Sequence, residues 1–268
     1  MLFRSKADPG TGSDGFGYRL LSDLGITYAA PLPALCPLHL SAPYDPALAG
    51  LRMQGRIEVA CRGKVLAGDT GEIQFTKEGI SGIPVMNVSG IAARTLSEKQ
   101  PVTAKVNLLP GGIYGLSGLS ELTDRKDADV LKRLFSAQAE ERAMDVLGGL
   151  LPHKALPVFF KAAKIRPDLP ARDMNEGRIE SLLRALTNAT YPVTGTAGFD
   201  RAQVTKGGVF LSDIDPATME SRQVRNLYFA GEIMNADGRC GGYNLQWAFA
   251  SGHIAGLAAA EGKGRKGC

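Results

Sequence analysis

The sequence predicts an α/β fold, α+β overall, in which one block of the chain is inserted into another. Residues 226–256 show an apolar strand, a glycine turn and a helix in succession, an order typical of sheets covered by helices. An earlier segment alternates apolar and polar residues as half-buried strands do, and the segment after it carries apolar residues at helical spacing. The expected divisions are 1–32 and 191–261 for the outer domain, 33–190 for the insert (β-rich over 35–110, helical over 120–188), and 262–268 for a disordered tail.

The first element is the glycine-rich loop Pro9–Gly17, which leads into a helix with an apolar face. Thr11 or Ser13 is placed to cap this helix and Gly25 to end it. By its spacing alone, the loop is either a plain turn or a cradle for a phosphate. Residues 25–28 then predict a short strand, and Pro31 and Pro33 mark the exit from the domain.

The next block predicts a small β-barrel or sandwich. Ile57, Val59 and Cys61 alternate with charged residues, which is the period of a half-buried strand. Residues 68–71 favour a turn, and residues 79–84 favour a loop with Pro84 in the first turn of a short helix. Further inward-facing positions are Ile73 and Phe75 on one strand, and Val102, Ala104, Val106 and Leu108 on another.

The third block reads as helical. Ile179, Leu182, Leu183 and Leu186 form an amphipathic stripe, and Leu131, Leu134 and Phe135 form an earlier one. Its basic residues form either a solvated face or a site for a dinucleotide phosphate or an RNA backbone. They are Lys154, Lys161, Lys164 and Arg166.

The chain then returns to the outer domain and ends in its most informative stretch. Residues 192–208 predict two short strands punctuated by glycine, and residues 215–221 predict a turn. The continuous apolar run Leu227–Ala230 indicates a strand buried on both faces. Gly231 permits a sharp turn, Glu232 stands at the carboxyl end of the strand, and a helix should begin near Gly242. The small residues expected to lie against the sheet are Ala248, Gly252 and Gly256.

A helix start placed in this way has a specific chemical use. Its free N–H groups carry about half a positive charge, which favours an anionic ligand by at most ~2 kcal/mol. That energy corresponds to about 40 mV for a two-electron couple. The helix start would therefore tune a flavin that becomes anionic on reduction, although a buried strand–helix unit without a ligand fits the bare pattern equally well.

Composition narrows the class of protein. The chain has 268 residues, 44% of them hydrophobic and 22% charged, and its net charge of +4 does not by itself indicate nucleic acid binding. The four cysteines include no C-x-x-C pair, which disfavours disulfides and zinc and suits the cytoplasm. The three histidines are scattered, so no metal site is predicted. No signal peptide opens the sequence, and the helix after Tyr243 favours burial over a membrane span.

Four stretches resemble one known family. They are 227–232 with 237–252, the loop around Thr11, Gly12 and Ser13, Phe75–Gly82 with its Phe-Thr-x-x-Gly-Ile-Ser-Gly pattern, and residues 204–208, which match a Val-Thr-x-Gly-Gly-Val element. Together they are similar to the HI0933-like flavoproteins, also known as aminoacetone oxidase-like or BaiN-like FAD-dependent oxidoreductases. The resemblance implies a partial FAD/NAD(P)-binding Rossmann-like domain with an inserted β-barrel and helical domain.

The resemblance also implies which residues approach the cofactor. Gly231 and Glu232 would contact the ribityl or diphosphate region, and the helix start would meet the flavin ring. No convincing acid–base pair is visible, so the catalytic residues are left unassigned. The implied FAD-binding residues are Thr11, Gly12, Thr205, Gly207, Gly208, Gly231, Glu232, Gly241, Gly242, Tyr243, Asn244 and Leu245.

The chain departs from the family in one respect. Intact members begin with a strand, a G-x-G-x-x-G turn and a helix that hold the adenosine and pyrophosphate of FAD, and no such strand–turn–helix unit is predicted in this sequence. We therefore expect these residues alone to be a fragment, the flavin-ring half of the enzyme, with the nucleotide half supplied by another chain or segment.

Three functions remain in competition at this point. The first is hydride transfer through FAD, with NAD(P)H or a substrate as donor and an enone, an amine-derived acceptor or oxygen as acceptor. The second is a non-enzymatic truncated product that binds a partner chain. The third is a nucleic-acid-binding module formed by the barrel and the basic helices, which the 7% aromatic content disfavours.

Overall fold

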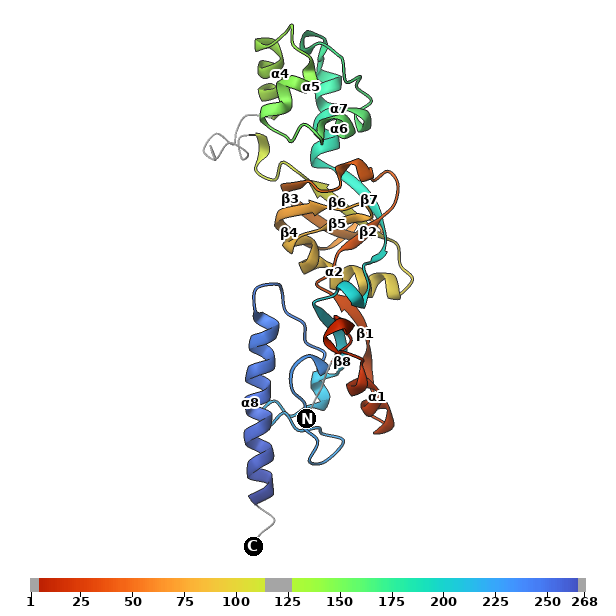
Figure 1. Cartoon of the computed structure of the whole chain (residues 1–268), viewed down its shortest axis with the longest axis vertical. Helices are drawn as coiled ribbons and strands as arrows, with labels where there is room; N and C mark the ends of the chain where they lie inside the picture. Colours follow the sequence, from red (N-terminus) through yellow and green to blue (C-terminus); the bar gives the residue numbers. More distant parts are fainter. Residues whose placement is uncertain (1–4, 114–126, 265–268) are drawn as a thin grey trace. The chain divides into compact units, whose positions relative to one another are not determined.

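The computed structural model describes residues 5–113 and 127–264. The chain divides into two compact units, one made of residues 1–37 with 196–268 and the other of residues 38–195. Helices and strands are mixed in both units (Figure 1), which confirms the predicted fold class. None of the described helices combines the length and the apolar character that crossing a membrane requires.

The unit of residues 38–195 is built on a closed six-stranded barrel in the order β2-β5-β4-β3-β6-β7. Pairing is antiparallel throughout the recorded registers, as where Ile57 faces Asp69 on one side and Val106 on the other. The predicted inward residues are buried, among them Val59 and Ile73, except Cys61 at the end of its strand, which is half-buried. The strands are β2 (Leu38–Leu40), β3 (Arg52–Cys61), β4 (Lys64–Phe75), β5 (Gly79–Ser81), β6 (Val102–Asn107) and β7 (Ala189–Thr196).

Four expectations for the barrel were wrong. Residues 79–81, expected in a loop, form strand β5. Residues 68–71 form no turn but lie inside β4, because the chain turns earlier, at Arg62 and Gly63, both with positive φ. The helix after Pro84, α2 (Ile83–Ser97), is long rather than short. Residues 192–196 belong to β7 of the barrel, since Val193 pairs with Val102 of β6.

The helices of this unit share one hydrophobic cluster with the barrel. Both predicted stripes face that cluster, with Leu131 and Leu182 almost fully buried. Asn175 caps the last helix by accepting a hydrogen bond from the Arg178 amide at 3.0 Å. Besides α2, the helices are α4 (Asp127–Ala137), α5 (Ala143–Val146), α6 (Leu156–Ala162) and α7 (Glu176–Thr187), and the predicted helical residues 120–126 lie outside the described part.

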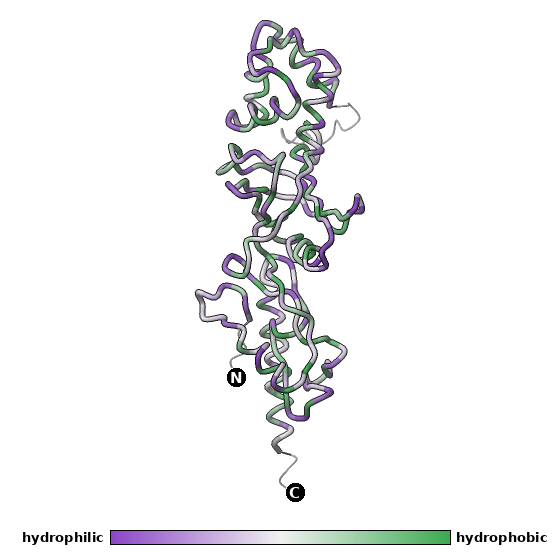
Figure 2. The backbone as a smooth tube through the Cα atoms, turned by 90° about the vertical axis from the view of Figure 1, so that its right-hand side faces the viewer, coloured by the Kyte–Doolittle hydropathy of each residue, from purple (hydrophilic) through white to green (hydrophobic). Residues whose placement is uncertain are grey.

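The other unit contains a two-stranded antiparallel ribbon and two helices. Its core gathers residues from the whole unit, including Tyr18, Val209 and Phe229. In Figure 2 the hydropathy colouring changes over short intervals along the chain, as amphipathic elements require. The elements are η1 (Pro9–Thr11), α1 (Phe16–Asp23), β1 (Tyr28–Ala34), η5 (Phe199–Arg201), β8 (Val204–Val209), η6 (Leu211–Asp213), η7 (Gly231–Ile233) and α8 (Tyr243–Gly264).

The N-terminal part of this unit corrects two predictions. Helix α1 is preceded by Gly15 with φ of 75° and not by Thr11 or Ser13, because Asp14 instead accepts the Phe16 amide. The expected strand at residues 25–28 begins only at Tyr28, and both Pro31 and Pro33 lie within it rather than after it.

Three predictions for the C-terminal part of this unit were wrong. Leu227–Ala230 is extended, but it forms only an isolated bridge at Tyr228, because no described strand lies beside it. Helix α8 begins at Tyr243 as expected, yet Gly252 and Gly256 meet open space; Ser251 and Ala255 are the buried positions. The helix also extends to Gly264, into the segment expected to be a disordered tail.

Candidate functional site

The carboxylate of Glu232 connects η7 to β8. Its Oε1 accepts a hydrogen bond from the backbone N–H of Thr205, and the Thr205 hydroxyl accepts one from the Lys6 amide at 3.3 Å. Glu232 is half-buried, and its second oxygen receives no hydrogen bond from a described residue. That oxygen is therefore available to a hydroxyl group of a ligand.

Gly207 and Gly208 are explained by the close approach of neighbouring backbone. A Cβ atom at Gly207 would lie 2.5 Å from the Ala30 carbonyl oxygen, and one at Gly208 would lie 2.3 Å from that of Ile233. Both residues also have positive φ, of 106° and 113°. The fold alone requires these glycines, so their role beside a flavin stays a prediction.

Gly231 fastens α8 to η7. Its N–H donates to Ser251 Oγ at 2.9 Å, and its carbonyl accepts from Trp247 Nε1 at 3.2 Å. Ser251 Oγ donates in turn to the Trp247 carbonyl at 2.6 Å. Because Ser251 is 1% exposed, these bonds lie away from water and fix the position of the helix.

The start of α8 is open. Gly241 and Gly242 precede it with φ of 122° and 90°, and a Cβ atom at Gly242 would meet nothing within 4 Å. The Gln246 amide donates to Gly242 O at 2.9 Å, and no described side chain accepts from the amides of Tyr243, Asn244 or Leu245. These amides are the free donors of a helix N-terminus, and they carry its positive end.

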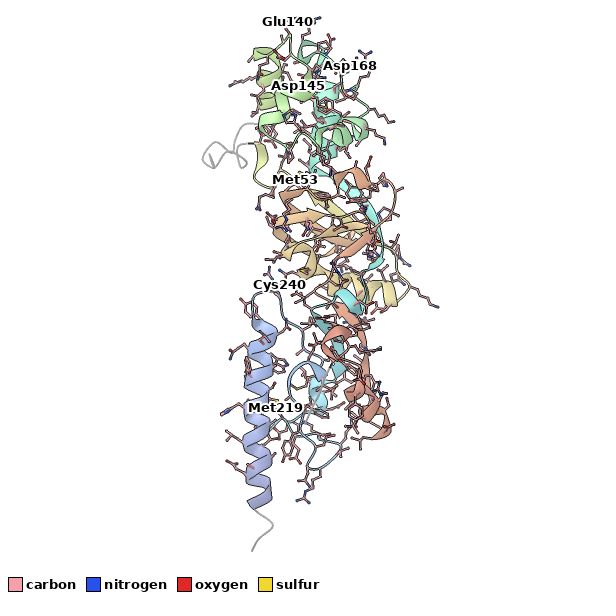
Figure 3. The ribbon with its side chains drawn as sticks, in the orientation of Figure 1. Met53, Glu140, Asp145, Asp168, Met219 and Cys240 are labelled. Carbon is pink, nitrogen blue, oxygen red and sulfur yellow. The ribbon has the colours of Figure 1, made fainter. Side chains whose placement is uncertain are left out.

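Asn244 holds the loop ahead of this helix. Its Oδ1 accepts from the Gly238 amide at 2.7 Å and its Nδ2 donates to the Gly238 carbonyl at 3.0 Å. An ion pair between Lys206 Nζ and Asp237 Oδ1, at 2.7 Å, ties the same loop to β8. Figure 3 marks Cys240 in this loop, directly ahead of α8. The ion pair joins residues far apart in sequence, and no sequence pattern indicates it.

Tyr18 is a polar residue of this region. The sequence pattern predicts it only as part of the apolar face of the first helix and does not predict a role for its hydroxyl. The ring is 4% exposed, and its hydroxyl has no hydrogen-bond partner among the described residues. Burial raises the pKa of Tyr18, the Glu232 carboxylate raises it further, and the Thr205 hydroxyl, which lies near the phenol but outside hydrogen-bond geometry, lowers it. The one sequence signal for a polar role is that this buried position holds tyrosine, although phenylalanine would fill the same space. A buried phenol normally finds a hydrogen-bond partner.

The structure divides the predicted site residues into three groups. Thr205, Gly207, Gly208, Gly231 and Glu232 come together where β8 meets η7. Gly241, Gly242, Tyr243, Asn244 and Leu245 form the start of α8. Thr11 and Gly12 lie on the exposed loop ahead of α1, where Thr11 Oγ1 donates to the Asp8 carbonyl at 2.8 Å.

Comparison with known proteins identifies one matching family and several relatives of this chain. The family described as HI0933-like protein Rossmann domain matches residues 4–258. The chain is 36% identical over 260 residues to a 3-dehydro-bile acid delta(4,6)-reductase of Clostridium scindens, covering 96% of this chain and 60% of the relative. It is 28% identical over 251 residues to a ribosomal RNA dihydrouridine synthase of Haemophilus influenzae, covering 93% and 57%.

A second ribosomal RNA dihydrouridine synthase, from Escherichia coli, is 29% identical over 252 residues, with 91% of this chain and 56% of the relative covered. The chain thus spans somewhat more than half the length of the curated relatives it matches. The family match extends over nearly the whole chain and includes both parts of the unit that carries Glu232 and α8. The chain belongs to the HI0933-like Rossmann-domain family.

Proposed function

We propose that this chain supplies the flavin-ring side of an FAD-dependent oxidoreductase. The observation that carries the proposal is the open start of α8, where two glycines with positive φ precede amides that donate to no described side chain. Such a start favours negative charge on a bound group. A flavin gains that charge on reduction.

The residues present fit such a cofactor. The free amides of Tyr243, Asn244 and Leu245 are donors for a ring carbonyl, and the second oxygen of Glu232 is an acceptor for a ribityl hydroxyl. The buried Tyr18 hydroxyl, close to Glu232, lacks a partner as well. When bound, FAD supplies the hydride chemistry, while these residues bind and orient it.

The relatives favour one class of reaction. A delta(4,6)-reductase and a dihydrouridine synthase are both named for adding hydrogen to a double bond. We propose that the enzyme reduces a carbon–carbon double bond conjugated with a carbonyl, with NAD(P)H as the source of hydride. The substrate would be a small molecule or a base in RNA, and reduction of a cyclic enone compared with that of uridine in RNA separates the two.

The nucleotide half of the FAD site is proposed to come from another chain or segment. The G-x-G-x-x-G spacing at residues 10–15 follows no strand among the described residues, and α8 presents large apolar side chains to solvent. Leu245 is 66% exposed, Phe249 72% and Leu257 54%. Side chains of this size gain by being covered, so this face of α8 is the surface on which the missing half would pack.

Flavin titration of the purified chain tests the proposal. Trp247 is the single tryptophan and lies in the first turns of α8, so a flavin ring at the helix start should quench its fluorescence. We expect saturable quenching by both riboflavin and FAD with similar affinity, because the adenosine and pyrophosphate are assigned to another chain or segment.

A pair of variants makes this titration specific. Gly242→Val places a branched side chain at the helix start, and quenching should be lost. Gly63→Val is the matched control, because Gly63 also has positive φ and open space around it but lies in the barrel hairpin. Non-saturable quenching, or equal effects of the two changes, would contradict the proposed flavin position. Tight retention of FAD through gel filtration would instead contradict the idea that the chain is only half of the site.

A further inference from the structure

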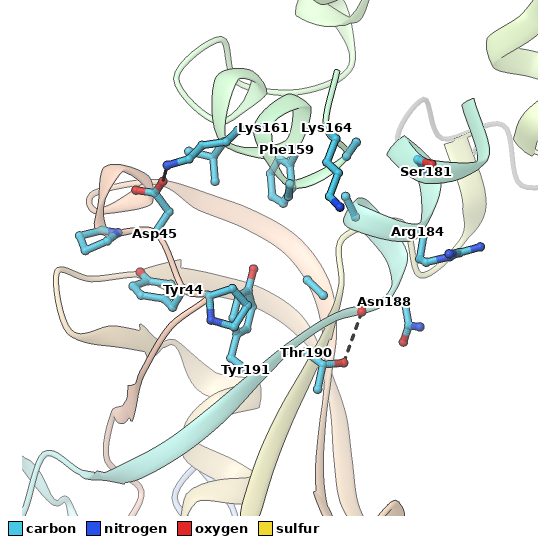
Figure 4. Close-up of a pocket in the computed structure, with 17 residues that line it drawn as sticks. Tyr44, Asp45, Phe159, Lys161, Lys164, Ser181, Arg184, Asn188, Thr190 and Tyr191 are labelled. Atoms are coloured by element: carbon cyan, nitrogen blue, oxygen red, sulfur yellow. Dashed lines mark hydrogen bonds and ion pairs between the residues drawn. The ribbon is translucent and has the colours of Figure 1, made fainter. Parts of the chain in front are cut away.

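The unit of residues 38–195 contains a second candidate site. A cavity of about 900 Å³ lies where the helices meet the barrel. Its walls come from the loop Pro43–Pro46, the end of α6, the second half of α7 and the beginning of β7 (Figure 4). The volume is within the range of small-molecule sites, about 300–1,000 Å³. None of its residues belongs to the unit that carries Glu232 and α8.

The charged lining of this cavity is mainly cationic. It includes Lys161, Lys164 and Arg184 against a single carboxylate, Asp45. Lys161 Nζ lies 3.4 Å from Asp45 Oδ2 and neutralises it. Neither Lys164 nor Arg184 has an ion pair with a described carboxylate. The cavity therefore carries unneutralised positive charge.

Tyr191 contributes a donor at the floor of the cavity. The residue is 7% exposed, and its hydroxyl makes no hydrogen bond to a described residue. In Figure 4 its oxygen points toward the space between Lys161 and Lys164. The adjacent Tyr44 differs, because its hydroxyl already donates to the carbonyls of Thr76 at 2.6 Å and Gly79 at 2.8 Å.

The protonation state of Tyr191 suits it to donate. Burial, and then the Asp45 carboxylate, raise the pKa of Tyr191 to about 12. The phenol thus keeps its proton at neutral pH and offers an O–H. A buried phenol of this kind is normally satisfied by a partner, and here the open side faces the cavity.

From these groups, we propose that the cavity binds a small organic phosphate of about nucleotide size, whose phosphate contacts Lys164 Nζ and the Tyr191 hydroxyl. Ammonium and phenol donors match phosphate oxygens. The small apolar residues of α6 and α7, such as Ala162 and Ala185, line the remaining space and would contact the organic part. The Asp45–Lys161 pair would lie at the opposite wall.

Calorimetry on the whole chain, in low-salt buffer free of phosphate, tests this assignment. The probes are adenosine monophosphate, inorganic pyrophosphate and uncharged adenosine. We expect the two phosphates to bind and adenosine to bind at least about tenfold more weakly. Lys164→Gln should weaken phosphate binding about tenfold, the usual effect of losing one charge-assisted hydrogen bond. Tyr191→Phe, which keeps the ring, should weaken it several-fold.

Arg133→Gln provides the matched control, because Arg133 is an exposed cation of the same helical region outside the cavity. It should leave binding unchanged, and unaltered thermal midpoints would show that all three variants fold. An equal loss in Arg133→Gln would overturn the proposal, as would the absence of binding at millimolar adenosine monophosphate. Binding of a 12-nucleotide RNA that adenosine monophosphate cannot displace would also overturn it. The outcome is independent of flavin, since no flavin is present.

Discussion

At the scale of single residues, two buried tyrosines differ in a way that decides their contribution to stability. Tyr18 and Tyr44 are both almost fully buried, at 4% and 8% exposure. The Tyr44 hydroxyl donates to two carbonyls, whereas the Tyr18 hydroxyl has no partner among the described residues. An unsatisfied buried polar group costs about 1–3 kcal/mol, and a satisfied one stabilises modestly.

Removing these two hydroxyls should therefore have opposite effects. In the chain alone, Tyr18→Phe should raise the free energy of unfolding by about 1 kcal/mol, because it removes an unsatisfied phenol. Tyr44→Phe should lower it by about 1–2 kcal/mol, because the Thr76 carbonyl loses its donor, while the Gly79 carbonyl keeps the Thr76 amide. Urea denaturation followed by circular dichroism measures both. Destabilisation by Tyr18→Phe would show that its hydroxyl has a partner after all.

The same residue explains a limit of the sequence reasoning. Tyr18 lies in the apolar stripe of α1, where the pattern correctly predicts burial. The pattern says nothing about what surrounds the hydroxyl, since Glu232 and Thr205 approach it only through the fold. Burial follows from local periodicity, whereas polar partners depend on residues about 200 positions away.

At the scale of elements, helix α8 is held through few contacts. Ser251 Oγ joins the Gly231 amide to the Trp247 carbonyl in a buried position. Ser251→Ala should lower the free energy of unfolding by about 1–2 kcal/mol, because it leaves the Gly231 N–H without a partner. Ser97→Ala is the control, since Ser97 Oγ donates to a carbonyl of its own helix in an exposed position. Urea titration followed by Trp247 emission compares the two variants, and equal effects would contradict this account.

The junction between β5 and α2 depends on a glycine for two reasons. Gly82 has φ of 100°, and a Cβ atom there would lie 2.3 Å from the Glu72 carbonyl oxygen. Gly63 has φ of 81° with nothing within 4 Å. Gly63→Ala should therefore cost about 1 kcal/mol from backbone strain alone. Gly82→Ala should cost clearly more, about 3 kcal/mol, because it adds overpacking. Thermal unfolding of both variants measures the difference, and similar midpoints would refute the steric part.

The elements also show where sequence patterns mislead. Alternation at Ile57 and Val59 identified β3 because one face of the strand is buried in the barrel. The apolar run Leu227–Ala230 failed as a strand, because apolar residues also line an extended segment without strand partners. The glycines at 68 and 71 suggested a turn, but a strand accepts glycine where neighbours approach closely: a Cβ at Gly68 would lie 2.9 Å from Arg56 Nη2.

At the scale of the whole molecule, buried phenols set an upper limit to the pH range of stability. Burial raises the pKa of Tyr18 and Tyr44 above the ordinary value, and that of Tyr191 to about 12. The unfolded chain releases these protons near pH 10 while the folded chain keeps them. Stability is therefore complete below pH 10 and falls as the pH rises toward the folded pKa values.

This fall should reach about 1.4 kcal/mol per pH unit for each phenol. Urea denaturation at pH 8, 10 and 11 measures it. Tyr44→Phe should reduce the slope above pH 10, because one of the phenols no longer titrates. A free energy of unfolding that stays constant to pH 11 would contradict the burial of these groups.

The sequence predicted the fold in outline, but it did not predict which strand closes the barrel. The resemblance carried by residues 227–252 predicted the family, and the family match confirms it. The same resemblance predicted an inserted barrel, which the closed six-stranded sheet confirms. The addition of β7 to that barrel could not be foreseen, because residues 189–196 pair with β6 across more than 80 positions of intervening sequence. Where the predicted cofactor residues lie relative to a flavin stays a prediction.

The two places where the chain passes between its units meet at one hydrogen bond. The Ala197 amide donates to the Pro37 carbonyl at 3.0 Å, beside the ribbon in which Ala34 pairs with Val204. The two ends of the insert are therefore close together, so the flanking segments can be joined directly when the insert is removed. Evolution or an engineer could exchange residues 38–195 for another module through a short linker and leave the β1–β8 ribbon in register.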